Sequence, residues 1–179
     1  MVGGAGSRRL HLAGVPSVVE RIRGLRDDRR LTQILADLGV TPDAWQRRGD
    51  DHVHGDLDGV PWQLILDGGL VSWVEATLAV RWLDDPSDDE ATEAAEDDTF
   101  ADFERVTAEV EMILGPPAFS DGAAAPGFPH DLDADWASTW PLPGWRLLVV
   151  PLHEDRELPF RVGILATPAS AAAGEPLFD

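Results

Sequence analysis

Residues 52–83, HVHGDLDGVPWQLILDGGLVSWVEATLAVRWL, alternate between apolar and polar side chains over most of their length. A period of two is typical of half-buried β-strands, and aspartate followed by glycine favours a tight turn between two strands. The pairs Asp58-Gly59 and Asp67-Gly68 therefore divide the segment. The pattern predicts an antiparallel group of three strands, over residues 52–57, 60–66 and 70–83.

A second group of strands is predicted near the end of the chain. Trp136, Ser138 and Trp140 alternate before a proline- and glycine-rich turn, and the nearly continuous apolar run that follows is typical of a central strand. The three strands of this group are predicted over residues 136–140, 145–153 and 160–167. Together the two groups predict an α+β protein with one antiparallel sheet of about six strands, arranged as two three-stranded meanders.

Apolar residues before each group of strands follow a helical period. Ser17 and Glu20 have the spacing of a capping box, which predicts that a helix begins there. Phe103 lies on the apolar side of a second helix, predicted over residues 100–114. The predicted order is therefore α-βββ-α-βββ, with the helices packed on one face of the sheet. Residues 84–98 hold nine acidic residues and no basic residue, and are predicted to be a solvated loop.

The length of 179 residues suits one domain, predicted over residues 15–167. Residues 1–14 are rich in glycine and arginine and are predicted to be a flexible arm, and residues 168–179 a disordered tail. The N-terminus lacks an apolar run of signal-peptide length, and no segment has the apolar length of a membrane span. A cytoplasmic location without membrane association is expected.

The composition excludes several kinds of chemistry. No cysteine is present, which excludes disulfides, thiolate catalysis and cysteine-ligated metals, and all 14 basic residues are arginine, which excludes a Walker A or Schiff-base lysine. The formal net charge is −19 and is unevenly distributed: residues 1–48 carry +4 and residues 49–179 carry −23. A body this acidic repels nucleic acid and anionic membranes and attracts a basic protein, unless the charge serves only solubility.

Three residues of the first predicted strand could bind a metal. His52, His54 and Asp56 lie on one face of that strand, and this arrangement resembles the first metal-binding segment of metallo-β-lactamase-type hydrolases. Leu57 stands where those enzymes have another histidine, and only His130 and His153 offer further imidazoles downstream. The alternative is a solvated strand face without a metal.

The segment from His54 to Leu57 also resembles the catalytic loop of aminoglycoside phosphotransferase-like kinases. This resemblance implies Asp56 as catalytic base and Glu75 as metal ligand. The sequence departs from that family because the metal-binding asparagine is missing, lysine is absent and the surrounding pattern is that of strands. A coincidental match is the alternative.

Residues 31–45 have the rhythm of a helix-turn-helix, followed by Arg47 and Arg48. Asp43 would stand where such a motif contacts bases, and the acidic body would repel DNA. The pattern therefore favours an ordinary pair of helices, and no nucleic-acid partner is expected.

The predicted order of elements resembles that of type III secretion chaperone-like domains. The acidic, cysteine-free and tryptophan-rich composition is similar to that of immunity proteins of actinobacterial polymorphic toxins. Both families act by covering a partner protein, so the resemblance implies a non-catalytic domain that neutralises or escorts a basic partner and needs no cofactor. The residues predicted to contact the partner are Asp84, Asp85, Asp88, Asp89, Glu90, Phe119 and Phe128.

Two further points stay open. A homodimer is compatible with the binding function, and the alternative function is a metal-dependent hydrolase or phosphotransferase-like enzyme centred on His52, His54 and Asp56. Six tryptophans fall mostly on the predicted core faces, and two or three of them on an outer face would form a binding surface. These tryptophans are Trp62, Trp73, Trp82, Trp136, Trp140 and Trp145.

Overall fold

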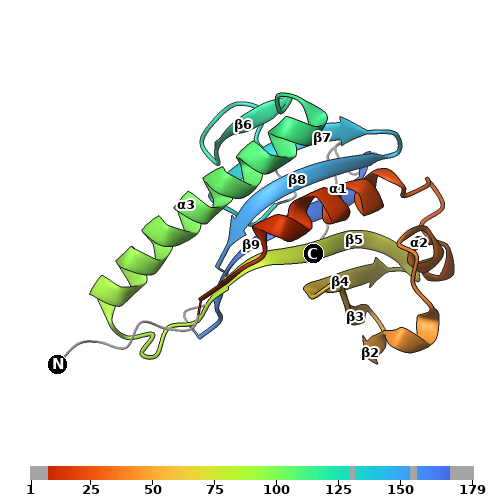
Figure 1. Cartoon of the computed structure of the whole chain (residues 1–179), viewed down its shortest axis with the longest axis horizontal. Helices are drawn as coiled ribbons and strands as arrows, with labels where there is room; N and C mark the ends of the chain where they lie inside the picture. The colour runs from red at the N-terminus through yellow and green to blue at the C-terminus, as the bar shows by residue number, and fades with distance from the viewer. Residues whose placement is uncertain (1–7, 130–131, 154–156, 170–179) are drawn as a thin grey trace.

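The computed structural model describes residues 8–129, 132–153 and 157–169, which form a layer of helices on a nine-stranded antiparallel sheet (Figure 1). The strands lie in the order β2-β3-β4-β5-β9-β8-β7-β6, and β1 pairs with β5 beyond the end of β4. The strands are β1 (Arg8–Leu10), β2 (Gln46–Arg48), β3 (His52–Leu57), β4 (Val60–Asp67), β5 (Leu70–Arg81), β6 (Phe119–Gly122), β7 (Trp136–Leu142), β8 (Trp145–Leu152) and β9 (Phe160–Pro168).

Both predicted meanders are present. β3, β4 and β5 are antiparallel neighbours, and so are β7, β8 and β9. The two meanders form one sheet because β5 pairs with β9, with Val74 opposite Ala166 and Arg81 opposite Phe160. The third strand of each meander therefore lies at the centre of the sheet, with both edges paired.

The sheet has nine strands, so the prediction of about six was wrong in number. The additional strands β1, β2 and β6 are three or four residues long. β1 lies in the segment that was predicted to be a flexible arm, and its Arg9 and Leu10 pair with Val80 and Ala79 of β5. Strands this short hold too few side chains to show an alternation, so their pairing depends on a sheet edge that exists only after folding.

The helices pack on one face of the sheet, as predicted (Figure 1). They are α1 (Val15–Arg23), α2 (Leu31–Asp37) and α3 (Asp89–Leu114), with 3₁₀ turns η1 (Leu12–Gly14) and η2 (Pro42–Ala44). α3 contacts α1 and packs across β5, β9 and β8. Val19 of α1, Val106 of α3 and Ile164 of β9 are fully buried in the main core between these layers.

α3 begins at Asp89, so the prediction of a solvated loop over residues 84–98 was wrong for most of that segment. The carboxylate of Asp88 caps the helix by accepting hydrogen bonds from the backbone N–H groups of Glu90 and Ala91, each at 3.1 Å. Acidic residues in a first turn interact favourably with the helix dipole, which explains why the charge run is helical. Among the described residues, no helix combines the length and the apolar character needed to cross a membrane.

A bulge in β5 changes which residues face the main core. Ile65 pairs with Trp73, but Leu66 pairs with Val71, so Ser72 is an extra residue on β5. An extra residue moves the following side chains to the other face of a strand. Regular alternation would place Val71 and Val74 on opposite faces, and the bulge instead places both in the main core.

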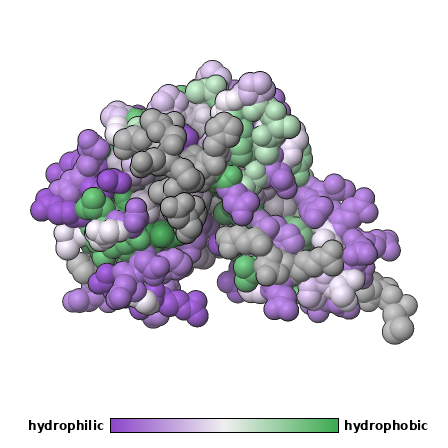
Figure 2. Space-filling view, turned by 180° about the vertical axis from the view of Figure 1, so that it is seen from behind, coloured by the Kyte–Doolittle hydropathy of each residue, from purple (hydrophilic) through white to green (hydrophobic). Residues whose placement is uncertain are grey.

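The face of the sheet opposite the helices carries a second, smaller apolar cluster. Leu148 and Leu165 are fully buried there, and Phe128 and Leu132 from the segment between β6 and β7 cover them. Seen from behind the helices, apolar side chains form patches bordered by polar ones (Figure 2). The segment between β6 and β7 therefore takes the place that a helix layer has on the other face.

Candidate functional site

The structure does not bring His52, His54 and Asp56 together as a metal site. All three lie on β3 at alternate positions. The Cα atoms of His52 and His54, and those of His54 and Asp56, are therefore each about 6.6 Å apart. Asp56 accepts a hydrogen bond from the backbone N–H of Gly59 at 2.8 Å, which stabilises the turn to β4. Within the described part of the chain, no group of three or more histidine or acidic residues could hold a metal ion.

Glu75, which the kinase resemblance implied as a metal ligand, is enclosed in the sheet. Its side chain is 1 % exposed and accepts from Gln63 Nε2 at 2.5 Å and Trp73 Nε1 at 3.3 Å through one oxygen. The other oxygen accepts from Thr77 Oγ1 at 3.1 Å and pairs with Arg161 Nη1 at 3.3 Å. Four donors surround this carboxylate, so its arrangement supports the sheet rather than a metal.

The predicted acidic contact residues lie at the amino end of α3 and just before it. Asp84, Asp85, Asp88, Asp89 and Glu90 are all exposed. The side chain and backbone of Ser87 both donate to Asp85, at 2.6 and 2.9 Å, and these hydrogen bonds lower the pKa of Asp85. All five carboxylates face solvent at the end of the helix that extends beyond the sheet (Figure 1).

Phe119 and Phe128, the predicted apolar contacts, cover each other. Their rings meet edge to face with centroids 6.1 Å apart, and Phe128 is 6 % exposed. Both belong to the second apolar cluster, Phe119 at its margin. Their cover thus comes from within the chain.

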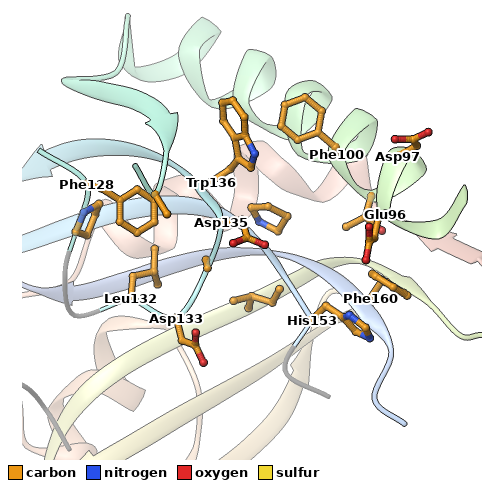
Figure 3. Close-up of a pocket in the computed structure, with 16 residues that line it drawn as sticks. Glu96, Asp97, Phe100, Phe128, Leu132, Asp133, Asp135, Trp136, His153 and Phe160 are labelled. Atoms are coloured by element: carbon orange, nitrogen blue, oxygen red, sulfur yellow. The ribbon is translucent and has the colours of Figure 1, made fainter. Parts of the chain in front are cut away.

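A groove that the sequence did not predict opens beside this cluster (Figure 3). It has a volume of about 650 Å³, within the range of pockets that bind ligands. Its walls come from the first half of α3, the segment between β6 and β7, the start of β7 and the ends of β8 and β9 that lie next to each other. Its aromatic lining consists of Phe100, Phe128, Trp136, His153 and Phe160.

Two ring pairs shape the groove. Phe100 of α3 meets Trp136 of β7 edge to face, with centroids 5.0 Å apart and an interplanar angle of 65°. His153 stacks on Phe160 with centroids 3.7 Å apart and an angle of 19°. Trp136 is 40 % exposed although its ring is large and apolar. The groove thus offers uncovered aromatic surface to a ligand.

The rim of the groove is negatively charged. Glu96 and Asp97 come from α3, and Asp133 and Asp135 precede β7 on the other side (Figure 3). All four are exposed, and none forms an ion pair with another described residue. Within the described part of the chain, a ligand that enters the groove therefore meets four carboxylates that form no ion pair.

Several arginines near the start of the chain pair locally with carboxylates outside the groove. Arg21 pairs with Asp58 at 2.9 Å, and Arg26 pairs with Asp37 at 2.6 Å. Arg30 pairs with Asp28, and its hydrogen bond lowers the pKa of Asp28 to about 2. Burial raises the pKa of Asp37, but the bonds from Arg26 outweigh it and the net shift is downward. Part of the positive charge of this segment is thus neutralised where it lies.

The groove was missed because its parts are distant in sequence. One signal was available: Glu96 and Phe100 are four residues apart, which places them on the same face of a helix. The spacing indicates a shared face only if Glu96 lies in a helix, and the sequence predicts a loop over residues 84–98. Trp136 was assigned to the core by its alternation with Trp140, but it is the first residue of β7 and lies at the end of the covered area.

Comparisons with known proteins leave the family of this chain open. No family model matches the sequence, and no curated protein matches it. Among solved structures, the chain is similar to the crystal structure of a DUF4309 family protein, YjgB, from Bacillus subtilis. The two share 9 % sequence identity with a TM-score of 0.41, over 88 % of this chain and 97 % of that chain. A similarity at this level says nothing about what the present chain binds or does.

Proposed function

We propose that this protein is a non-catalytic binding domain that captures a basic partner protein through the acidic aromatic groove and the exposed acidic end of α3. The groove carries the proposal, since it combines ring surface with four exposed carboxylates that form no ion pair with the residues the structure describes. Desolvated aromatic side chains supply much of the affinity of protein interfaces, and complementary charge supplies association rate and specificity. Capture of a basic protein in this way would neutralise or escort it, as immunity proteins and secretion chaperones do.

The acidic helix supports the same proposal from outside the groove. Asp89, Glu90 and Glu93 continue the negative surface from Glu96 and Asp97 along the first turns of α3, and all are exposed. An extended field of one sign steers a partner of the opposite sign toward the surface. We further propose a cytoplasmic location, which the absence of cysteine supports.

A peptide selection tests the proposal without knowledge of the natural partner. Random peptides displayed on phage are selected on the immobilised full-length protein at moderate salt. We expect the recovered peptides to be enriched in arginine and lysine, because only cationic segments complement the groove. For the strongest peptide, the double variant Glu96→Gln and Asp97→Asn should bind roughly three- to tenfold more weakly.

The control also removes two negative charges from α3, but at positions outside the groove. Glu104→Gln with Glu111→Gln changes exposed carboxylates of α3 that do not line it. Peptides that bind this control as tightly as the unmodified protein would support the groove. Recovered peptides that are neutral or acidic, or equal losses in both double variants, would contradict the proposed function.

A further inference from the structure

We infer that the groove receives an arginine side chain of the basic partner, with its guanidinium against the exposed ring of Trp136 and between the carboxylates of the rim. This inference rests on the proposed function and names the residue that anchors the partner. It starts from two facts that occur together in the groove: Trp136 is 40 % exposed, and four exposed carboxylates surround the same hollow.

The ring arrangement favours a flat cation. The edge-to-face contact with Phe100 holds the Trp136 ring in place where Trp136 lines the groove (Figure 3). The face of an indole carries negative electrostatic potential and attracts a cation within about 6 Å of its centre. On the other side of the hollow, the stack of His153 on Phe160 forms a second aromatic wall.

The carboxylates favour arginine over lysine. A guanidinium is planar, so it can stack on a ring with its faces while its N–H groups bond to carboxylates in its plane. The groove provides both kinds of contact, with Trp136 for the face and with Asp135 and Glu96 on opposite walls for the N–H groups. The ammonium of lysine is a compact, strongly hydrated charge, so it would not make the ring contact and the carboxylate contacts equally well at the same time.

The partner is a protein segment rather than a free small cation. The volume of about 650 Å³ exceeds that of a single side chain, and the hollow is open along the surface. The remaining space is lined by Phe128, Leu132 and Pro151, which suit apolar neighbours of the arginine. An arginine within a chain segment, flanked by apolar residues, fills both parts of the groove.

Three blocked amino acids test the anchor in solution. N-acetyl-arginine amide, N-acetyl-lysine amide and N-acetyl-citrulline amide are titrated into the ¹⁵N-labelled full-length protein at constant ionic strength. The signal of the Trp136 indole N–H is identified by its loss in Trp136→Phe. We expect the arginine amide to shift this signal saturably, the lysine amide to bind at least about threefold more weakly, and the neutral citrulline amide to cause no shift.

A second exposed tryptophan is the internal control. Trp82 is 51 % exposed and lies outside the groove, so its indole signal should not move. Equal shifts at Trp82 and Trp136, an equal shift with citrulline, or tighter binding of lysine would each overturn the arginine anchor. Glu96→Gln with Asp135→Asn should weaken arginine binding about three- to tenfold, whereas Glu104→Gln with Glu111→Gln should leave it unchanged.

The outcome for the anchor can be separated from that for the proposed function. Trp136→Ala should weaken the strongest displayed peptide by about three- to tenfold while its fold, monitored by its thermal midpoint, is retained because the ring is half exposed. Trp136→Leu keeps an apolar side chain there and should show the same loss. If basic peptides are recovered but bind both variants unchanged, the anchor is refuted and the proposed function stands. If no basic peptides are recovered, both are refuted.

Discussion

Glu75 shows how far a single buried charge depends on its neighbours. The side chain is almost completely buried at the centre of the sheet, where an isolated carboxylate would be unstable. Gln63, Trp73, Thr77 and Arg161 each donate to it, from β4, β5 and β9. A motif resemblance could draw attention to this residue, but only the sheet register shows that its oxygens are already used within the chain.

We expect Glu75→Gln to lower the free energy of unfolding by about 3 kcal/mol, because removing one member of a buried charged pair leaves the donors around it poorly matched. The amide NH₂ of glutamine would also face donors such as Gln63 and Trp73 instead of accepting from them. Urea denaturation monitored by tryptophan fluorescence measures the difference. The control, Asp67→Asn, changes an exposed carboxylate at the end of β4 and should stay within about 0.5 kcal/mol of the unmodified protein.

At the scale of elements, alternation and turn chemistry predicted the six main strands closely. The predicted range of β3 is the observed one. The observed ends of β4, β5, β7, β8 and β9 lie within two residues of the predicted ends. These strands are long enough to alternate and are bounded by glycine turns such as Asp58-Gly59. The short strands could not be predicted because they pair with edges that other segments create. The bulge at Ser72 could not be predicted for the same reason, since it is a property of the β4–β5 pair.

The helix α3 was predicted only in its apolar half. Its first half has few apolar residues, so it shows no helical stripe, and its charges are also typical of a loop. The cap at Asp88 and the favourable interaction of early acidic residues with the helix dipole stabilise it instead. This error also hid the groove, because two of its four rim carboxylates lie on that half of α3.

The apolar half of α3 holds the helix on the sheet, and Phe103 tests that role. Phe103 is 4 % exposed in the main core, so Phe103→Ala should leave a cavity and lower the free energy of unfolding by about 3–5 kcal/mol. Met112→Ala on the same helix is the matched control, because Met112 is 72 % exposed and its truncation should cost less than about 0.5 kcal/mol. Equal effects in urea denaturation would mean that α3 does not pack as described.

At the scale of the whole molecule, charge is separated between two ends. The arginines of residues 1–48 are concentrated around α1, α2 and β2, where Arg21, Arg26 and Arg30 pair with nearby carboxylates. The acidic excess extends from the amino end of α3 into the groove. Segregated charge was visible in the sequence, but its partial neutralisation at one end and its exposure at the other depend on the fold. The exposed end is therefore the one that we propose attracts a basic partner.

This separation predicts that association and dissociation respond to different changes. For a basic display-selected peptide, the association rate should fall markedly as salt rises, since the Debye length shrinks from about 10 Å at 0.1 M to about 3 Å at 1 M. The dissociation rate should change less, because ring contacts in the groove hold the bound peptide. Surface plasmon resonance across this salt range measures both rates.

Two triple variants locate the steering charges. Asp84→Asn, Asp89→Asn and Glu90→Gln remove three carboxylates near the amino end of α3 and leave its cap at Asp88 intact. Asp50→Asn, Asp51→Asn and Asp67→Asn remove three exposed carboxylates from the turn between β2 and β3 and from the end of β4, at the other end of the molecule. The first triple should slow association several-fold at low salt and leave dissociation unchanged, because steering depends on charge near the path of approach. The second should slow it less. Equal slowing by both would mean that net charge alone acts, and association rates independent of salt would remove the physical basis for a basic partner.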